Sequence, residues 1–400
     1  MEILSNDGRF KGILNEGVRV FRGITFATYE RFEPAEPVEY TEGVADAAGY
    51  GCVCPQRSDR VMGEEKGARI EEGRLCLSVY TPETGENLPV MVWIHGGSFL
   101  TGGSEEKRHG CERLVNAGNV VVIKISYRLG ALGFLYMPEK GIENLGLKDQ
   151  QLALDWIRRY APSFGGDPKR VTIFGQSAGA LSIGAIISGC GENPPFCKAI
   201  IQSSPFGIKS SPKAASVVTR KFLRKLGKDP MAASLDEILD AQEYVSESVS
   251  GLSFMPIVDS FTAIPQSVSS SGMKILSGCT KHDASPFVRG SLGKLFDSFI
   301  GRCGISAVTK IIFSNPNRKY VLSLRKAGVE AAEYLFSWHP KGSPYGACHC
   351  IELPFLLGEY DDWCEAPMLA GMYREEYESN SRLLLSAWVG FANDGVFPEL

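Results

Sequence analysis

Apolar residues in the first third of the chain gather in short runs dominated by β-branched side chains. Such runs predict strands, and here they span residues 18–27, 75–80, 90–94 and 120–127. A different pattern follows, in which Leu147, Leu154 and Ile157 recur near helical spacing and predict a helix over residues 145–160. Strand-like and helical patterns therefore alternate along this part of the chain.

The alternation continues through the middle of the chain. A β-branched run predicts a strand at residues 170–174, small and apolar residues predict a buried helix at 178–188, and a strand is expected at 198–203. Strands that alternate with helices are typical of an α/β fold. We therefore expect a central, mostly parallel, twisted sheet that is flanked by helices.

Two segments with helical patterns interrupt this alternation, at residues 206–251 and 296–326. In the first, Ser234 and Glu237 form the pattern of a capping box, which predicts a helix over residues 235–245. Further expected elements are a strand at 273–279 and helices at 306–313, 319–326 and 381–392. We expect a single domain over residues 1–400, in which the two segments are helical insertions that lie over one edge of the sheet and line a substrate pocket.

Charge and hydropathy exclude several classes of protein. The 42 Lys and Arg residues nearly balance the 46 Asp and Glu residues, for a formal net charge of −4. No basic cluster is present to contact phosphates, so we expect no nucleic-acid partner. No run approaches the roughly 18 apolar residues of a membrane span, and charged residues occupy the N-terminal stretch where a signal peptide is apolar. We therefore expect a cytoplasmic protein without a membrane span.

The eleven cysteines form neither a disulfide framework nor a recognisable metal motif. Their number is odd and their spacings are irregular. A single residue separates Cys52 from Cys54, and likewise Cys348 from Cys350, whereas paired zinc ligands usually have two to four residues between them. We expect buried free thiols in a reducing compartment, and no metal or other cofactor.

The strongest chemical signal is the sequence Gly-Gln-Ser-Ala-Gly at residues 175–179, between a predicted strand and a predicted helix. This context is typical of a nucleophile elbow, in which a serine is held on a sharp turn at the end of a strand. A side chain at either glycine would crowd the neighbouring strand or helix. Ser177 is therefore the candidate nucleophile, and the N–H group of Ala178 lies where an oxyanion would form.

A second signal is the sequence His-Gly-Gly-Ser-Phe at residues 95–99, directly after a predicted strand. Glycines in such a loop let the backbone approach a substrate closely. The backbone N–H groups of Gly97 and Ser98 are therefore expected to form an oxyanion hole together with that of Ala178. The alternative interpretation is a plain tight turn after a buried strand.

Elimination among the five histidines gives the candidate base. In folds with a nucleophile elbow the triad follows the chain order serine, acid, histidine, which excludes the two histidines upstream of the serine. His282 leaves little chain for a preceding acid, and His339 precedes a proline in an aromatic run. His349 lies in a predicted turn before a helical pattern, and we expect it to be the general base.

The residues alone do not decide the acid. Asp259, Asp283 and Asp297 all lie between the candidate serine and the candidate histidine. Asp283 comes just after the strand expected at 273–279, where a loop carboxylate could reach the imidazole. Each of the three could instead be a solvated loop carboxylate or a helix cap.

Longer stretches carry further motifs. They are Phe-Arg-Gly-Ile-Thr-Phe-Ala at 21–27, Trp-Ile-His-Gly-Gly at 93–97, Tyr-Arg-Leu-Gly at 127–130, Gly-Phe-Leu at 133–135, Asn-Leu-Gly at 144–146, Phe-Gly-Gly-Asp-Pro at 164–168 and Val-Thr-Ile-Phe-Gly at 171–175. In this order they resemble the type-B carboxylesterase and cholinesterase family of α/β-hydrolases. The resemblance covers most of the chain and implies the α/β-hydrolase fold.

The resemblance also assigns the acid. Asp283 falls on the position at which this family has the Glu of its catalytic triad, and an Asp can take that role. His349, followed by Glu352-Leu-Pro-Phe, falls on the family's histidine loop. The triad implied by the resemblance is Ser177, Asp283 and His349, with Gln176 and Glu352 among the side chains that surround it.

Two further implications concern the scaffold. Glu72 and Arg128 fall on positions that form a structural ion pair in the family, and we expect the same pair here. Arg74 occupies a position at which the family usually has a cysteine, so Cys54 lacks the partner of the family's early disulfide. The residue before the nucleophile is Gln176 where the family usually has Glu, which removes a negative charge beside the site.

These observations predict a serine carboxylesterase that hydrolyses small-molecule esters through a Ser-His-Asp triad and an acyl-enzyme intermediate. Two alternatives stay open. The same triad could act on amides, thioesters or carbamates, or the chain could be a non-catalytic binding member of the fold. The natural substrate and the oligomeric state are not indicated by the sequence.

Overall fold

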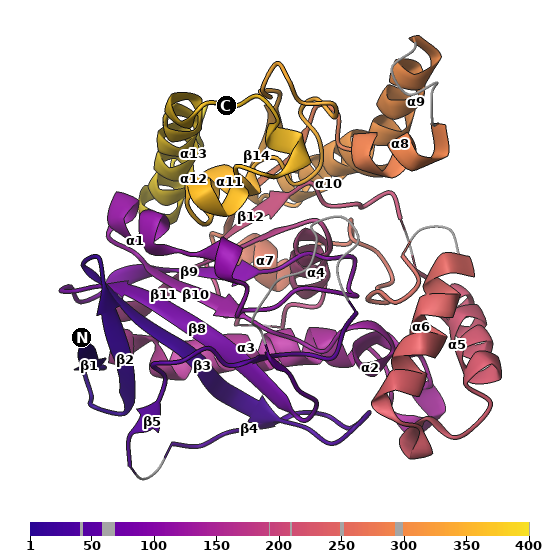
Figure 1. The fold of residues 1–400 in the computed structure, drawn as a ribbon, viewed down its shortest axis with the longest axis horizontal. Coiled ribbons are helices and arrows are strands. Elements are labelled where there is room, and N and C mark those ends of the chain that lie inside the picture. Colours follow the sequence, from indigo (N-terminus) through magenta and orange to yellow (C-terminus); the bar gives the residue numbers. More distant parts are fainter. Residues whose placement is uncertain are drawn as a thin grey trace.

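The computed structural model describes residues 1–40, 43–57, 69–191, 193–208, 210–248, 252–292 and 299–399 (Figure 1). Parts of both predicted insertions lie outside the described residues, namely 209 and 249–251 in the first and 296–298 in the second. The strands are β1 Glu2–Leu4, β2 Phe10–Asn15, β3 Val18–Thr28, β4 Glu36–Pro37, β5 Ala45–Asp46, β6 Cys52–Val53, β7 Arg69–Ile70, β8 Arg74–Pro82, β9 Leu88–Ile94, β10 Val121–Ile125, β11 Gly166–Gln176, β12 Lys198–Gln202, β13 Lys274–Thr280 and β14 Glu330–Phe336.

Across the described residues, a single mixed sheet organises the chain. Its order is β1-β2-β3-β8-β10-β9-β11-β12-β13-β14, with β4 beside β3 and β5 beside β2. The pairs from β10 through β9 and β11 to β14 are parallel, whereas those from β1 to β10 are antiparallel. The half of the sheet that follows β10 is therefore entirely parallel, as parallel strands joined by helical crossovers require.

Helices cover both faces of this sheet (Figure 1). The helices of the described residues are α1 Glu112–Gly118, α2 Gly130–Phe134, α3 Leu145–Tyr160, α4 Ala178–Ser188, α5 Pro212–Leu226, α6 Leu235–Ser248, α7 Gln266–Ser270, α8 Ser285–Leu292, α9 Phe299–Thr309, α10 Asn315–Lys326, α11 Leu353–Leu356, α12 Tyr360–Trp363 and α13 Arg374–Asp394. A π-helical turn at Lys310–Ser314 joins α9 to α10. The helices α5 and α6 pack together at the end of the sheet near α2.

The central strands are apolar on both faces because both faces are buried. In β9, Val90 and Val92 belong to an apolar core that includes residues of α3 and α4. The alternate residues Met91 and Trp93 point into a second core with α1 and α13. This two-sided burial explains why β9 is a continuous apolar run in the sequence instead of an alternating one.

Most predicted elements are present. The helices predicted at 145–160 and 178–188 match α3 and α4, and the prediction of a mostly parallel sheet flanked by helices is confirmed. The capping box is also confirmed, because Ser234 N–H donates to Glu237 Oε2 at 2.8 Å and Glu237 N–H donates to Ser234 Oγ at 3.3 Å. The two helices predicted at 306–313 and 319–326 are parts of the continuous run from α9 to α10.

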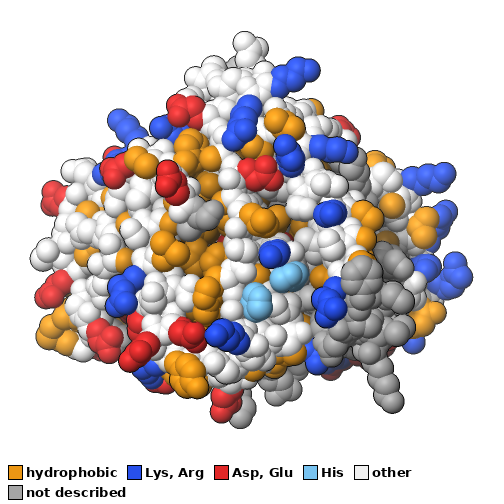
Figure 2. All heavy atoms as spheres, turned by 90° about the horizontal axis from the view of Figure 1, so that it is seen from above, with side chains coloured by type: hydrophobic (Ala, Val, Ile, Leu, Met, Phe, Trp, Pro, Cys, Tyr) orange, Lys and Arg blue, Asp and Glu red, His pale blue; other side chains and the backbone are white. Residues whose placement is uncertain are grey.

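In the part of the chain that the structure describes, no helix is long and apolar enough to cross a membrane. On the face drawn in Figure 2, Asp and Glu side chains lie mainly on the left, Lys and Arg side chains lie over the whole width, and hydrophobic side chains gather between them.

Candidate active site

The predicted site residues lie on loops at the carboxyl ends of parallel strands. The 95–99 loop follows β9, Ser177 follows β11, Asp283 comes shortly after β13, and His349 lies on the loop between β14 and α11. Because these strands are parallel, their carboxyl ends lie at the same edge of the sheet. Loops at this edge are where open α/β sheets place their ligand sites.

Ser177 occupies a strained turn between β11 and α4. Its φ of 57° and ψ of −120° place a non-glycine residue at positive φ, a conformation that costs energy and is concentrated at functional sites. A Cβ atom at Gly175 would lie 2.7 Å from the carbonyl oxygen of Ile94, and one at Gly179 would lie 2.0 Å from the same atom. The predicted steric reason for the two glycines is therefore confirmed.

The loop after β9 lies directly against this turn. A Cβ atom at Gly96 would come within 3.2 Å of Ser177 Cβ, and both Gly97 and Ser98 adopt positive φ, at 98° and 57°. Among the described residues, the backbone N–H groups of Gly97, Ser98 and Ala178 donate no hydrogen bond to another backbone carbonyl. Free N–H groups beside a nucleophile are the components of an oxyanion hole.

Asp283 and His349 form a short, buried hydrogen bond, with 2.6 Å between Oδ1 and Nδ1. Oδ2 of Asp283 accepts from Ser203 Oγ at 2.9 Å and from Thr280 N–H at 3.0 Å. The carboxylate is fully buried and the histidine is nearly so. With Oδ2 occupied by two donors, Oδ1 is left to accept from Nδ1–H, which fixes the histidine tautomer with Nε2 unprotonated.

Of the other two candidate acids, Asp259 is exposed and Asp297 lies outside the described residues. The structure thus brings Asp283, and not Asp259, to the imidazole.

The loops that carry Asp283 and His349 are joined by several hydrogen bonds. His282 N–H donates to the carbonyl oxygen of Ala347 at 2.8 Å, and Ala347 N–H donates to His282 Nδ1 at 3.1 Å. Ser285 Oγ donates to the carbonyl oxygen of Tyr345 at 2.7 Å. These bonds fix the position of the 345–349 segment relative to β13, so the short bond from His349 to its acid does not depend on a single contact.

The partner of His349 Nε2 in this structure is the side-chain amide of Gln176. Gln176 Nε2 lies 3.1 Å from the imidazole Nε2. The other end of the amide, Oε1, accepts from the thiol of Cys350 at 3.4 Å. Ser177, the next residue along the chain, is half-buried beside this contact.

Glu352 is buried close to Asp283. Its Oε1 accepts a hydrogen bond of 2.7 Å from the hydroxyl of Tyr334. Burial raises the pKa of Glu352 to about 8, and the negative charge of Asp283 adds to the rise, although the Tyr334 bond opposes it. Glu352 therefore keeps its proton to a higher pH than an exposed glutamate does.

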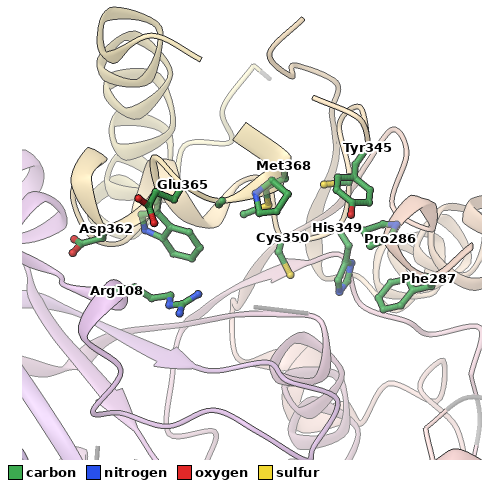
Figure 3. Close-up of a pocket in the computed structure, with 13 residues that line it drawn as sticks. Arg108, Pro286, Phe287, Tyr345, His349, Cys350, Asp362, Glu365 and Met368 are labelled. Carbon is green, nitrogen blue, oxygen red and sulfur yellow. The ribbon is translucent and has the colours of Figure 1, made fainter. Parts of the chain in front are cut away.

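A pocket of about 430 Å³ opens beside His349 (Figure 3). Near the imidazole it is apolar, with the ring of Phe287 centred 5.2 Å from the histidine ring and Met368 farther along. The opposite end carries Arg108 and Glu365. Phe313 packs on the same imidazole from the second insertion, with ring centres 5.3 Å apart, but it does not line this pocket. The volume lies within the range of small-molecule sites.

Comparisons with known proteins now decide the family. The profile of the "Carboxylesterase family" matches residues 2–300. The chain belongs to the carboxylesterase family. It is 33% identical to the para-nitrobenzyl esterase of Bacillus subtilis, over 97% of this chain and 88% of the relative. It is also 33% identical to the probable N-octanoylanthranilate hydrolase AqdA2 of Rhodococcus erythropolis, over 97% of this chain and 92% of that protein.

Solved structures of carboxylesterases share the fold. A thermophilic para-nitrobenzyl esterase superposes with a TM-score of 0.85 at 30% identity, covering 99% of this chain and 91% of the other. The predicted α/β-hydrolase fold and the predicted family are therefore confirmed, and the chain is a carboxylic-ester hydrolase.

The predicted ion pair between Glu72 and Arg128 is wrong for this carboxylesterase. Arg128, fully buried, donates from its backbone N–H, Nε and Nη2 to Asp149 on α3, at 2.6 to 3.0 Å. Glu72 instead accepts two hydrogen bonds, of 2.7 and 2.6 Å, from Arg31. A fully buried guanidinium needs a carboxylate that is equally buried, and Asp149 provides one whereas Glu72 is partly exposed.

Sequence reasoning missed several residues that shape the site. Ser203, which orients Asp283, and Phe287 and Phe313, which pack on His349, were not candidates. Ser203 carries a usable signal, since it directly follows β12, the strand between those that carry the serine and the acid. Within the described residues, no group of three or more His, Cys, Asp or Glu side chains is arranged to hold a metal ion.

Proposed function

We propose that this carboxylesterase hydrolyses small carboxylic esters with Ser177 as nucleophile, His349 as general base and Asp283 as the group that orients His349. The observation that carries the assignment is the 2.6 Å bond between Asp283 and His349, whose Nε2 faces the strand end that holds the strained Ser177.

The proposed reaction consists of two acyl transfers, the first to Ser177 and the second to water. His349 Nε2 takes the proton of Ser177 as the hydroxyl oxygen bonds to the ester carbonyl carbon, and the N–H groups of Gly97, Ser98 and Ala178 hold the oxyanion. The bond to the alcohol then breaks, and the alcohol leaves with the proton from His349. Water, deprotonated by the same imidazole, attacks the acyl-enzyme, and the serine leaves reprotonated.

The pocket beside His349, whose lining includes His349 but not Ser177, is proposed to receive an apolar or aromatic group of the ester. Its lining includes the apolar side chains of Pro286, Phe287 and Met368 and the indole of Trp363. Burial of apolar substrate surface is worth about 25 cal/mol per Å². The two predicted insertions, 206–251 and 296–326, are proposed to shape the substrate site elsewhere around His349, outside the lining of this pocket. Phe313 on the second is the support for this part of the proposal.

A second candidate activity is hydrolysis of an acyl group carried on nitrogen. It is favoured by the relative named for hydrolysis of N-octanoylanthranilate. Comparing kcat/KM for an ester and an amide of the same acyl group separates the two activities. A higher kcat/KM for the amide would favour the second one.

The test of the assignment is the Ser177→Ala variant. It is expected to lose turnover of a chromogenic short-chain ester and labelling by a fluorophosphonate probe, while Ser188→Ala at the other end of α4 keeps both. Ester turnover by Ser177→Ala at the wild-type rate would overturn the proposal. Absence of probe labelling in the wild-type protein would favour the non-catalytic binding alternative.

A cytoplasmic location is also proposed. None of the eleven cysteines is joined to another in a disulfide, the state that a reducing compartment maintains. Determining the thiol state of the protein isolated from its native cells tests this point.

A further inference from the structure

One contact at the site has no part in the proposed chemistry, namely the amide of Gln176 on His349 Nε2, at 3.1 Å. This nitrogen is the atom that must accept the serine proton. The contact belongs to a chain of three side chains, because the thiol of Cys350 lies 3.4 Å from the other end of the same amide. Gln176 is fully buried, so its orientation is set by these neighbours and not by water.

The direction of the amide follows from the histidine tautomer. Nδ1 of His349 lies 2.6 Å from a carboxylate oxygen, so Nδ1 carries the proton and Nε2 presents a lone pair. The NH₂ end of Gln176 can donate to that lone pair, whereas its carbonyl end would place two acceptors against each other. The S–H group of Cys350 can donate to the carbonyl end, which holds the amide in the productive orientation.

The geometry points to Gln176 as a positioning residue for ester hydrolysis: its amide holds His349 neutral and correctly oriented while the site is empty, and the contact is lost once Nε2 takes the serine proton. After proton transfer, Nε2–H and the amide N–H are both donors and repel each other. The imidazolium is then free to present its proton to the leaving alcohol. This inference rests on the proposed function, because it needs His349 to act as the base.

The other ionisable groups that surround the imidazole are present in wild type and in the Gln176 variants alike. Asp283 bonds Nδ1, Glu352 lies behind Asp283, and aromatic rings of α8 and the π-helical turn cover the ring. The remaining ionisable side chains of the surrounding loops and pocket are Cys279, His282, Tyr345, Cys348, Cys350, Arg108, Asp362 and Glu365.

The experiment is the pH dependence of kcat/KM for a neutral ester, measured on wild type, Gln176→Met, Gln176→Glu and Cys350→Ala. Loss of the donor to Nε2 favours protonation of the imidazole. In Gln176→Met, the pH at which kcat/KM falls to half its maximum on the acid side is therefore expected to rise by about half a pH unit. This shift corresponds to one net hydrogen bond. Gln176→Glu adds a carboxylate that holds the imidazolium, so a shift of about one unit or more is expected. Cys350→Ala should shift it in the same direction by less.

Gln150→Met is the matched control, since Gln150 is an equally buried glutamine whose amide donates to Ser182 Oγ at 3.0 Å within the α3–α4 packing. Its profile should coincide with that of wild type. Coincident profiles for wild type and Gln176→Met, with Ser177 still labelled by fluorophosphonate, would overturn the inference while leaving the proposed function intact. A wild-type protein that is neither labelled nor active would overturn the proposed function itself.

Discussion

The Asp283→Asn substitution tests whether the Asp283 carboxylate orients His349 or only fills the space beside it. Oδ2 of Asp283 faces two donors, Ser203 Oγ and the backbone N–H of Thr280. The serine hydroxyl can rotate and accept, but the Thr280 N–H can only donate. The new amide must therefore turn its carbonyl oxygen to Thr280 and its NH₂ group to His349 Nδ1. His349 then carries its proton on Nε2, where it cannot accept one from the serine.

The size of the effect follows from the contacts. To restore the active tautomer, the amide must turn over and leave the buried Thr280 N–H unpaired, which costs about 1–3 kcal/mol. The charge-assisted bond that stabilises the imidazolium is lost as well, at about 1.5–3 kcal/mol. Together these give roughly 2.5–6 kcal/mol, or a decrease in kcat/KM of about 10²- to 10⁴-fold at 1.36 kcal/mol per factor of ten.

The assay is kcat/KM for a chromogenic ester, together with the rate of fluorophosphonate labelling, and both should fall by the same factor. The bonds to Ser203 and Thr280 can be kept, so the melting temperature is expected to change little. Asp259→Asn is the control, because this exposed aspartate is the other described candidate acid. Activity of a folded Asp283→Asn variant within threefold of wild type, or a large loss in Asp259→Asn, would refute the reasoning.

Three further predictions concern stability. Asp149→Ala leaves the Arg128 guanidinium buried without its partner and should cost about 3–5 kcal/mol in denaturant unfolding, whereas Glu72→Ala, at a partly exposed pair, should cost about 1 kcal/mol or less. Glu352→Gln should raise the melting temperature at pH 8 but not at pH 4.5. The pKa of Glu352, at about 8 in the fold, lies above its ordinary value, so the carboxyl favours the folded state only in its protonated form and its contribution is lost as pH rises toward 8. Gly179→Ala should unfold the elbow or abolish activity, because its Cβ would lie 2.0 Å from a carbonyl oxygen, while Gly189→Ala, with 3.5 Å to its nearest neighbour, should be tolerated in both assays.

Sequence patterns predict an element well where its neighbours in the fold restrict which residue types can occupy it. The apolar run of β9 reflects burial on both faces, and the glycines at 175 and 179 reflect a carbonyl oxygen too close for any side chain. The strand β14 leaves no such trace. Its sequence, Glu-Ala-Ala-Glu-Tyr-Leu-Phe, is rich in residues that are depleted in strands, and it is a strand because its backbone pairs with β13 at the edge of the sheet.

Local sequence patterns also do not show which of two carboxylates pairs with the buried Arg128. Glu72 and Asp149 both carry a carboxylate, which is the chemical group that pairs with the Arg128 guanidinium. What decides between them is that α3 directs Asp149 into the buried interior, whereas the loop before β8 leaves Glu72 partly exposed to pair with Arg31. Side-chain direction across elements is set by packing, so a family position alone did not give the correct pair.

The same argument explains why the partner of the His349 imidazole is not visible in the sequence. Along a regular strand, consecutive side chains point to opposite faces, so the residue before a nucleophile is expected to point away from it. At the elbow the positive φ of Ser177 ends that alternation, and the amide of Gln176 meets His349 Nε2 at the edge of the sheet. The turn that holds Ser177 thus also places an amide donor on His349, the proposed base, and a substitution at 176 should therefore act on proton transfer more than on the fold.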